Sequence, residues 1–159
     1  MVEDLENILT EMDADWERTA EGSFLVVLPG TRKLKTNCNL FVEDDTLRIE
    51  AFVVRCPEQD AERLWRLLLR RNAEMYAVSF AIDDNGDVYL VGRIPLAGVD
   101  AAEVDRLLGS VLTYADDIFN TALEIGFAQS IRREWRWRVT RGEPTRNLAA
   151  FEHLKPDDL

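Results

Sequence analysis

Two apolar segments rich in β-forming residues flank the dipeptide Asn85-Gly86, and this pattern restricts the fold more than any other in the chain. The segments are 78–82 and 88–94, and five polar residues or glycines separate them. Asn and Gly tolerate the positive φ angles of a type I′ turn, which joins neighbouring antiparallel strands. The sequence therefore predicts a β-hairpin with a type I′ turn at Asn85-Gly86.

Two further hairpins are predicted in the first third of the chain. The first pairs strands at 16–19 and 24–28 across a turn that contains Gly22. The second pairs strands at 37–42 and 47–54 across three consecutive acidic residues, which suit a tight polar turn. Alternation in the last strand places four apolar side chains on one face, namely Leu47, Ile49, Ala51 and Val53.

Apolar residues at three- and four-residue spacing predict three helices. The first covers 2–12, and the second starts at Pro57 and carries apolar residues as far as Tyr76. The third follows Asp100, a capping residue with Glu103 as its capping-box partner, and continues for about six turns. The element order is then α-β-β-β-β-α-β-β-α, an α+β fold with helices packed on an antiparallel sheet.

The chain has 159 residues, which suits one domain with one sizeable core. Hydrophobic residues make up 47% and charged residues 31%, a balance typical of a globular protein. Beyond Pro144 the apolar periodicity fades, and the last four residues form a loose acidic end. We expect a single domain over 1–140 and a C-terminal tail over 141–159.

The net charge disfavours nucleic acid as a partner. Thirty acidic and 19 basic side chains give a formal charge of -11, which repels phosphates and anionic lipid head groups. No apolar run approaches the ~20 residues that span a bilayer. The N-terminal 12 residues are acidic, unlike a signal peptide. We expect a cytoplasmic protein that does not insert into membranes.

Three local motifs resemble one known family. A leucine-rich helix ends in an asparagine (Leu64-Trp65-Arg66-Leu67-Leu68-Leu69-Arg70-Arg71-Asn72), a hairpin ends in Ile94-Pro95-Leu96, and Asp116-Asp117 falls late in the last helix. In these motifs and in element order, residues 2–130 resemble the YbjN family, whose fold is similar to that of type III secretion chaperones. The segment from Phe127 onward resembles actinobacterial members. The resemblance implies a small dimeric regulatory or chaperone-like protein that uses no cofactor.

Histidine and cysteine give little support for catalysis. His153 is the only histidine and lies in the expected tail, so a catalytic triad would require the tail to fold back beside a serine or cysteine. Cys38 and Cys56 have no CxxC spacing and no neighbouring histidine cluster. We expect both cysteines to be buried, reduced thiols.

The acidic residues give little support for a metal site or for acid-base chemistry. Asp83, Asn85 and Asp87 alternate like calcium ligands, but no glutamate closes a twelve-residue loop, and a hairpin turn explains them more simply. The pairs Asp44-Asp45 and Asp116-Asp117 are expected to be solvated. Glycine-rich phosphate-binding motifs are also missing from the sequence. We therefore expect a protein that is not an enzyme and that holds neither a metal nor a cofactor.

One segment departs from the acidic background because arginine and tryptophan alternate along it. Its candidate residues for binding a partner or an anion are Arg132, Arg133, Trp135, Arg136, Trp137 and Arg138. Charge, stacking and cation-π contacts would let such a segment bind acidic peptides, phosphates or single-stranded bases. The alternative is packing, either as a strand that turns Trp135 and Trp137 to one face or as a helix that continues the apolar stripe through Ile131 and Trp135.

Two functional hypotheses follow from the sequence. The leading one is a protein-binding module, chaperone-like or regulatory, that acts through a dimeric or client-binding surface, with a homodimer or a protein client as partner. The alternative is a small-molecule or nucleotide sensor that uses the basic-aromatic segment as an anion-binding site.

Overall fold

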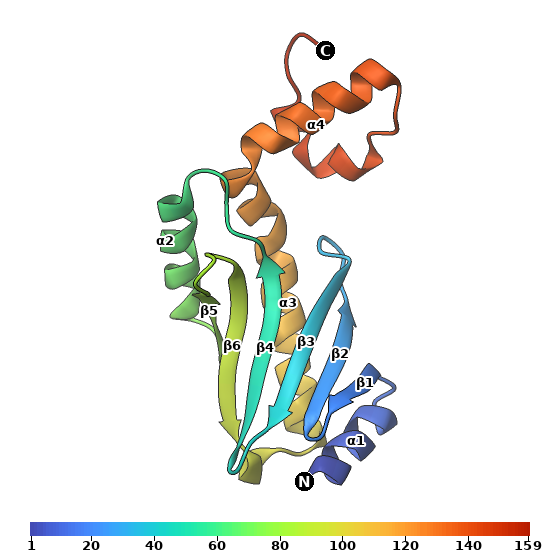
Figure 1. The fold of residues 1–159 in the computed structure, drawn as a ribbon, viewed down its shortest axis with the longest axis vertical. Coiled ribbons are helices and arrows are strands. Elements are labelled where there is room, and N and C mark those ends of the chain that lie inside the picture. Colours follow the sequence, from blue (N-terminus) through green and yellow to red (C-terminus); the bar gives the residue numbers. More distant parts are fainter.

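The computed structural model describes residues 1–159, and its central element is a six-stranded antiparallel sheet (Figure 1). The strands follow the order β1-β2-β3-β4-β6-β5 across the sheet, so β1 and β5 are the edge strands. The strands are β1 Asp15–Ala20, β2 Ser23–Pro29, β3 Lys35–Val42, β4 Thr46–Val54, β5 Val78–Ile82 and β6 Val88–Pro95. The helices are α1 Val2–Glu11, α2 Ala61–Asn72, α3 Ala101–Gly126 and α4 Ala128–Arg141, with short 3₁₀ helices η1 Leu96–Gly98 and η2 Arg146–Leu154. The predicted α+β fold and its element order are confirmed.

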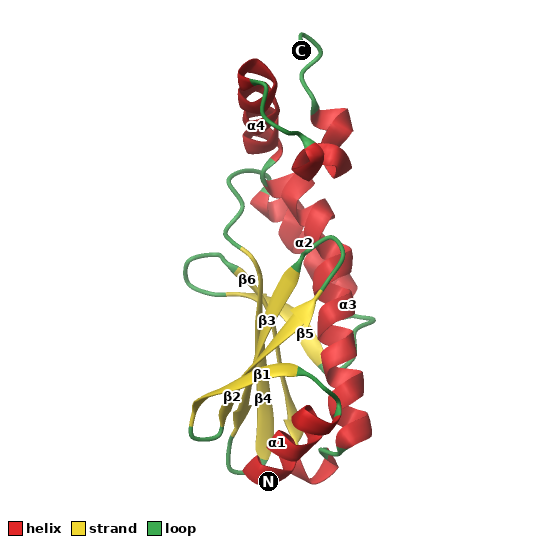
Figure 2. Ribbon diagram, turned by 90° about the vertical axis from the view of Figure 1, so that its right-hand side faces the viewer, coloured by secondary structure: helices red, strands yellow, loops and turns green.

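The helices α1, α2 and α3 cover one face of the sheet, and no element covers the other face (Figure 2). The covered face carries the alternating apolar residues predicted for β4, since Leu47, Ile49, Ala51 and Val53 are all fully buried. They belong to a core of 27 buried residues that joins the sheet to these helices. Burial of alternate side chains fixes the register of the sheet against the helices.

The longest helix, α3, begins at the predicted position. The Asp100 carboxylate accepts a hydrogen bond from the backbone N–H of Glu103, with 2.8 Å between N and Oδ1. The reciprocal half of the predicted capping box is replaced, because the Glu103 carboxylate instead accepts a hydrogen bond from the Tyr76 hydroxyl. None of the helices combines the length and the apolar character that a membrane crossing requires.

The hairpin between β5 and β6 is confirmed, but its predicted turn type is wrong. Gly86 has a φ of +81°, whereas Asn85 is not among the residues with positive φ, as a type I′ turn would require. The Asp83 carboxylate organises the loop instead, since it accepts hydrogen bonds from the backbone N–H groups of Asn85 and Asp87, each over 2.9 Å. Only Gly86 therefore needs the left-handed conformation.

The second helix starts four residues later than Pro57, at Ala61, so that prediction is wrong. The backbone N–H groups of Glu58 and Gln59 donate to the Gly126 carbonyl at the end of α3, over 2.9 and 3.2 Å. Asp60, which follows them, has a φ of +50°, so a right-handed helix cannot run through it and α2 begins only after it. The result is a connection that docks the end of β4 onto the end of α3.

The two cysteines have different environments. Cys38 is fully buried, and burial raises the pKa of its thiol to about 12. Cys56 is exposed, which contradicts the expectation that both thiols are buried. It follows the last residue of β4, Val54, and lies in the connection to α2 rather than in the sheet. Both thiols are free.

The C-terminal segment forms a lobe of its own, which we define as residues 128–154 (Figure 1). Its core consists of six buried residues from α4 and η2, namely Ala128, Ile131, Trp135, Leu148, Phe151 and Leu154. The expected loss of apolar order beyond Pro144 is wrong, because η2 buries Leu148, Phe151 and Leu154 at three-residue spacing, in two 3₁₀ segments that meet at a kink at Phe151. The domain boundary at residue 140 stays a prediction.

Candidate functional site

An apolar groove lies between α2 and the edge strand β5. Its volume is about 270 Å³. All six residues that line it are apolar, namely Trp65, Leu68, Leu69, Phe80, Ala81 and Ile82. Leu69 and Ile82 are 68% and 50% exposed, which is high for large apolar side chains. Clusters of exposed apolar residues mark binding surfaces, so the α2–β5 groove is the strongest candidate for one.

The leucine-rich sequence of α2 explains why this helix has two apolar faces. Leu64 and Leu68 are one helical turn apart and are buried against the core. Leu69 is rotated about 100° from Leu68 because an α-helix turns once in 3.6 residues, and its side chain therefore lies over the groove. The core stripe of this helix contains Leu64 and Leu68, and Trp65 and Leu69 extend its apolar surface over the groove.

Asn72, the last residue of α2, joins this helix to β5. Its amide nitrogen donates to the Phe80 carbonyl over 3.1 Å, and its amide oxygen accepts from the Phe80 N–H over 2.7 Å. The backbone N–H of Val78 donates to the Tyr76 carbonyl over 2.7 Å. These bonds occupy groups that an edge strand would otherwise offer to another strand. A partner in the groove would therefore contact side chains rather than extend the sheet at Phe80.

The two tryptophans of the basic-aromatic segment lie on different sides of α4. Trp135 is 3% exposed, and its indole N–H donates to the Phe151 carbonyl over 2.9 Å. Trp137 is 47% exposed, because two residues in a helix are rotated by about 200°. The segment is a helix, and Trp135 is a packing residue in it. The pair does not form one aromatic surface.

Most of the arginines in this segment contact carboxylates of the same chain. Arg136 and Asp158 form a two-bond ion pair with both distances at 2.9 Å, and this bond holds the pKa of Asp158 below its usual range. Arg138 Nε lies 2.6 Å from Glu134 Oε1. Arg132 is exposed and makes no ion pair. The positive charge available to an external anion is therefore smaller than the sequence indicates.

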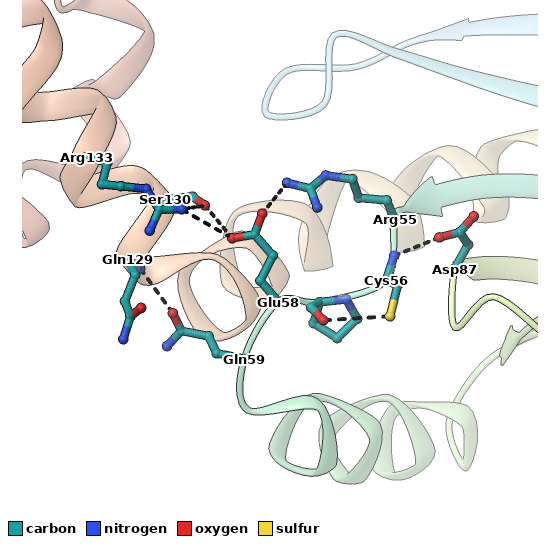
Figure 3. Close-up of polar contacts among 9 residues, drawn as sticks. Arg55, Cys56, Glu58, Gln59, Asp87, Gln129, Ser130 and Arg133 are labelled. Atoms are coloured by element: carbon teal, nitrogen blue, oxygen red, sulfur yellow. Dashed lines mark hydrogen bonds and ion pairs between the residues drawn. The ribbon is translucent and has the colours of Figure 1, made fainter.

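A cluster of polar contacts around Glu58 joins the C-terminal lobe to the rest of the molecule (Figure 3). The Glu58 carboxylate accepts hydrogen bonds from the Ser130 hydroxyl and, over 2.9 Å, from Arg55. Arg133 Nη2 lies 3.8 Å from Oε2 of the same carboxylate. These contacts, the Ser130 bond first, lower the pKa of Glu58. Arg133 therefore lies at the junction, with its side chain still 70% exposed.

The sequence interpretation missed the role of Asp116, which was expected to be solvated. Its Oδ1 accepts hydrogen bonds from the backbone N–H groups of Thr31, Arg32 and Lys33, over 2.9, 2.7 and 2.9 Å. Burial alone would raise the pKa of Asp116, but the three N–H donors outweigh it and lower the pKa. Asp116 thus holds the β2–β3 loop on α3. Only a contact between residues more than 80 positions apart reveals this.

Comparison with known proteins identifies relatives over most of the chain. The YbjN family, described as "Putative bacterial sensory transduction regulator", matches residues 2–124. An uncharacterised protein of Mycobacterium tuberculosis strain H37Rv is 52% identical over 140 residues, which are 88% of this chain and 76% of that protein. An uncharacterised protein of Mycobacterium leprae is 49% identical over 134 residues, 84% of this chain and 73% of its own. These mycobacterial relatives agree with the resemblance to actinobacterial members.

Solved structures share the fold at low sequence identity. A chain of the ExsC-ExsE complex has a TM-score of 0.55 and 19% identity, over 74% of this chain and 89% of its own. The structure of the Yersinia pestis type III secretion chaperone SycH with a fragment of YscM2 has a TM-score of 0.51 and 16% identity, over 72% and 95%. YbjN from E. coli has a TM-score of 0.53 and 15% identity, over 77% and 90%.

At these identities the structural likeness shows the fold alone, which is that of the type III secretion chaperones. The family itself rests on the match across residues 2–124 and on relatives that are about half identical. By that evidence the chain belongs to the YbjN family.

Proposed function

We propose that the protein is a protein-binding module, chaperone-like or regulatory and without catalytic activity, and that the α2–β5 groove is its binding surface. The observation that carries the proposal is the groove's lining of six apolar residues, of which Leu69 is 68% exposed. Burial of apolar surface is the main favourable term in protein association. Structures that share this fold include the complexes ExsC-ExsE, ExoU-SpcU and HopA1-SchA, which supports a polypeptide as partner.

The first partner that we propose for the groove is a second copy of the chain. A two-fold dimer brings the same surface of each subunit together, so the surface must be complementary to itself. The groove offers both an exposed side chain and a hollow, because Leu69 is 68% exposed and lines the same groove as Trp65 and Ile82. In a two-fold arrangement, each Leu69 would enter the hollow of the other subunit. A client polypeptide is the second candidate for the same surface.

Photocrosslinking from the groove tests this proposal. A benzophenone amino acid replaces Leu69, and a matched variant carries it at Leu34, which is 77% exposed and lies outside the groove. We expect irradiation of the position-69 variant to give a covalent dimer, or a defined adduct with one client protein. The position-34 variant should give neither. Equal adducts from both positions, or none from position 69, would contradict a binding role for the groove.

A nucleotide or small-molecule sensor at the basic-aromatic segment is the second candidate function. Trp137 is 47% exposed, and the Arg141 guanidinium lies 5.1 Å from the centre of its ring, an arrangement that favours stacking with a base. A ligand at a hundred times its dissociation constant raises the free energy of unfolding by about 2.7 kcal/mol. Thermal unfolding with nucleotides tests the candidate, with Trp137→Ala as the variant that should lose the response. A melting temperature that no nucleotide raises would exclude a nucleotide sensor at this segment.

A further inference from the structure

A second apolar cleft lies on the opposite side of α3 from α2, and two cations line it. It is formed by the β2–β3 loop, the end of β4 and the last two turns of α3, and its volume is about 330 Å³. Its lining residues are Lys33, Phe52, Val53, Val54, Arg55, Phe119, Leu123 and Phe127. None of them belongs to the α2–β5 groove or to the basic-aromatic segment. The volume is at the small end of the range for ligand pockets, about 300–1,000 Å³.

Lys33 is a partly buried cation that has no counterion. Its ammonium nitrogen lies 5.0 Å from the ring centre of Phe119 and 5.6 Å from that of Phe52. No carboxylate forms an ion pair with it, and burial lowers its pKa from the ordinary value of a lysine. Cation-π contacts are weaker than a desolvated ion pair, so this ammonium lacks the partner that buried charges usually have.

The position of Lys33 is fixed by the loop to which it belongs. Asp116 accepts the backbone N–H of Lys33 over 2.9 Å, together with those of the two preceding residues. A Cβ atom on Gly30 would lie 2.2 Å from the Lys33 carbonyl oxygen, so the loop can close this tightly only with glycine there. The backbone from which the Lys33 side chain extends is thereby fixed before any ligand arrives, which lowers the entropy cost of binding.

Arg55 supplies the second cation at the other end of the cleft. Its guanidinium lies 4.3 Å from the ring centre of Phe127. It contacts Glu58 through Nη2 at 2.9 Å and retains further N–H donors, since a guanidinium has five. A chain with a net charge of -11 thus concentrates two cations on one aromatic cleft. The two cations are complementary to an anion, and the aromatic lining is complementary to an apolar body attached to it.

We propose that the cleft lined by Lys33, Arg55, Phe52 and Phe119 binds a small amphipathic organic anion. The acid group of the ligand, a carboxylate or a sulfonate, contacts the Lys33 ammonium. The apolar body, an aromatic ring or a short alkyl chain, packs on the apolar wall that Phe119, Leu123 and Phe127 form. The proposal is independent of the partner in the α2–β5 groove, because the two surfaces share no residue.

Two fluorescent probes with the same apolar body test the role of the charge. Anilinonaphthalene sulfonate carries an acid group, and phenylnaphthylamine has the same rings without one. We expect the wild-type protein to bind the sulfonate at least tenfold more tightly than the neutral probe. Lys33→Met keeps the apolar stem and removes the charge, so this variant should bind both probes with similar affinity. Lys35→Met is the matched control, because Lys35 is exposed on β3 and lies outside the cleft, and it should leave both affinities unchanged.

Three results would overturn the proposal. The first is that the wild-type protein binds both probes with equal affinity. The second is that Lys33→Met leaves the sulfonate affinity unchanged. The third is that Lys35→Met lowers the sulfonate affinity as much as Lys33→Met does. The variant Leu69→Ser checks the location, because a sulfonate affinity that falls there places the probe in the α2–β5 groove. If Lys33→Met fails to fold by circular dichroism, Phe119→Leu decides instead. This variant keeps both cations and reduces the aromatic wall, so it must lower the affinity for both probes.

Discussion

Asp116 shows how one residue can hold two distant parts of the fold together. A single carboxylate oxygen accepts three backbone N–H groups of the β2–β3 loop, and its neighbour Asp117 makes one contact, with Arg32 at 3.3 Å. Hydrogen bonds to a charged group stabilise more than neutral ones do. Two adjacent acidic residues therefore have different roles, because α3 turns one of them toward the loop and the other to solvent.

Replacement of Asp116 should destabilise the protein much more than replacement of Asp117. We expect Asp116→Ala to lower the free energy of unfolding by about 1–3 kcal/mol, since three N–H groups lose their acceptor. Asp117→Ala, the matched control, should change it by less than about 0.5 kcal/mol because its contact is exposed. Urea unfolding at neutral pH measures both. Equal effects of the two variants would show that the loop does not depend on Asp116.

The lowered pKa of Asp116 also predicts a pH dependence. A carboxyl group whose pKa is lower in the folded state stabilises the fold at pH values above its unfolded pKa, about 3.9. This contribution is lost as the pH falls through the lower, folded pKa. The stability difference between wild type and Asp116→Ala should therefore be constant from about pH 5 upward and shrink below about pH 4. A difference that grows on acidification would contradict the assigned role.

Thr36 is a second residue whose environment leads to a prediction. Its side chain is fully buried in β3, and its hydroxyl oxygen has no hydrogen-bond partner. An unsatisfied buried polar group costs about 1–3 kcal/mol, and valine has nearly the same shape without the hydroxyl. We expect Thr36→Val to raise the free energy of unfolding by about 1 kcal/mol. In the control Thr46→Val, a hydroxyl that bonds Glu43 over 3.2 Å is removed, and no gain is expected.

At the scale of elements, the sequence predicts what depends on short-range patterns. The hairpins, the first helix and α3 with its Asp100 cap follow from alternation, helical spacing and capping chemistry within a few residues. The start of α2 is different, because Pro57 lies in a connection that docks onto the Gly126 carbonyl across the molecule. The exposure of Cys56 depends on where β4 ends. Local patterns contain no information about such contacts.

The candidate sites also differ in how much of each could be predicted from short-range patterns. The alternation of arginine and tryptophan in 132–138 is compatible with both a strand and a helix. A strand would place Trp135 and Trp137 on one face, whereas the helix that forms places them on different sides. The α2–β5 groove was not predicted, although its helix is leucine-rich and has more apolar residues than one core-facing stripe needs. Its other wall, β5, comes from the next hairpin, and the Asn72 contact that joins them requires the fold.

The two tryptophans of α4 provide a matched pair of variants for the C-terminal lobe. Trp135→Ala should cost about 3–5 kcal/mol, because it removes the largest side chain of a small core and its bond to Phe151. Trp137→Ala should change stability by less than about 0.5 kcal/mol. Since the lobe has its own core, hydrogen exchange in Trp135→Ala should accelerate across 128–154 and remain slow in α3. Uniform acceleration through the whole chain would indicate one cooperative core instead.

At the scale of the whole molecule, the two proposed binding surfaces lie on different sides of one scaffold. The sheet and α3 form the centre, with the α2–β5 groove at one edge and the cleft around Lys33 at the β2–β3 loop. The C-terminal lobe projects beyond the end of the sheet (Figure 1) and is joined to the scaffold by the Glu58 contacts (Figure 3). A protein partner and a small anion could therefore bind at the same time without sharing a residue.

Sedimentation equilibrium of wild type and a groove variant tests the central claim most directly. We expect the wild-type protein to have twice the mass of one chain at micromolar concentration. Leu69→Ser with Ile82→Ser should raise the dimer dissociation constant at least tenfold, which is about 1.4 kcal/mol, because both exposed side chains of the groove become polar. Leu34→Ser should leave it unchanged. A wild-type protein that remains monomeric at high concentration, or a dimer that the double variant leaves intact, would contradict self-association through this groove.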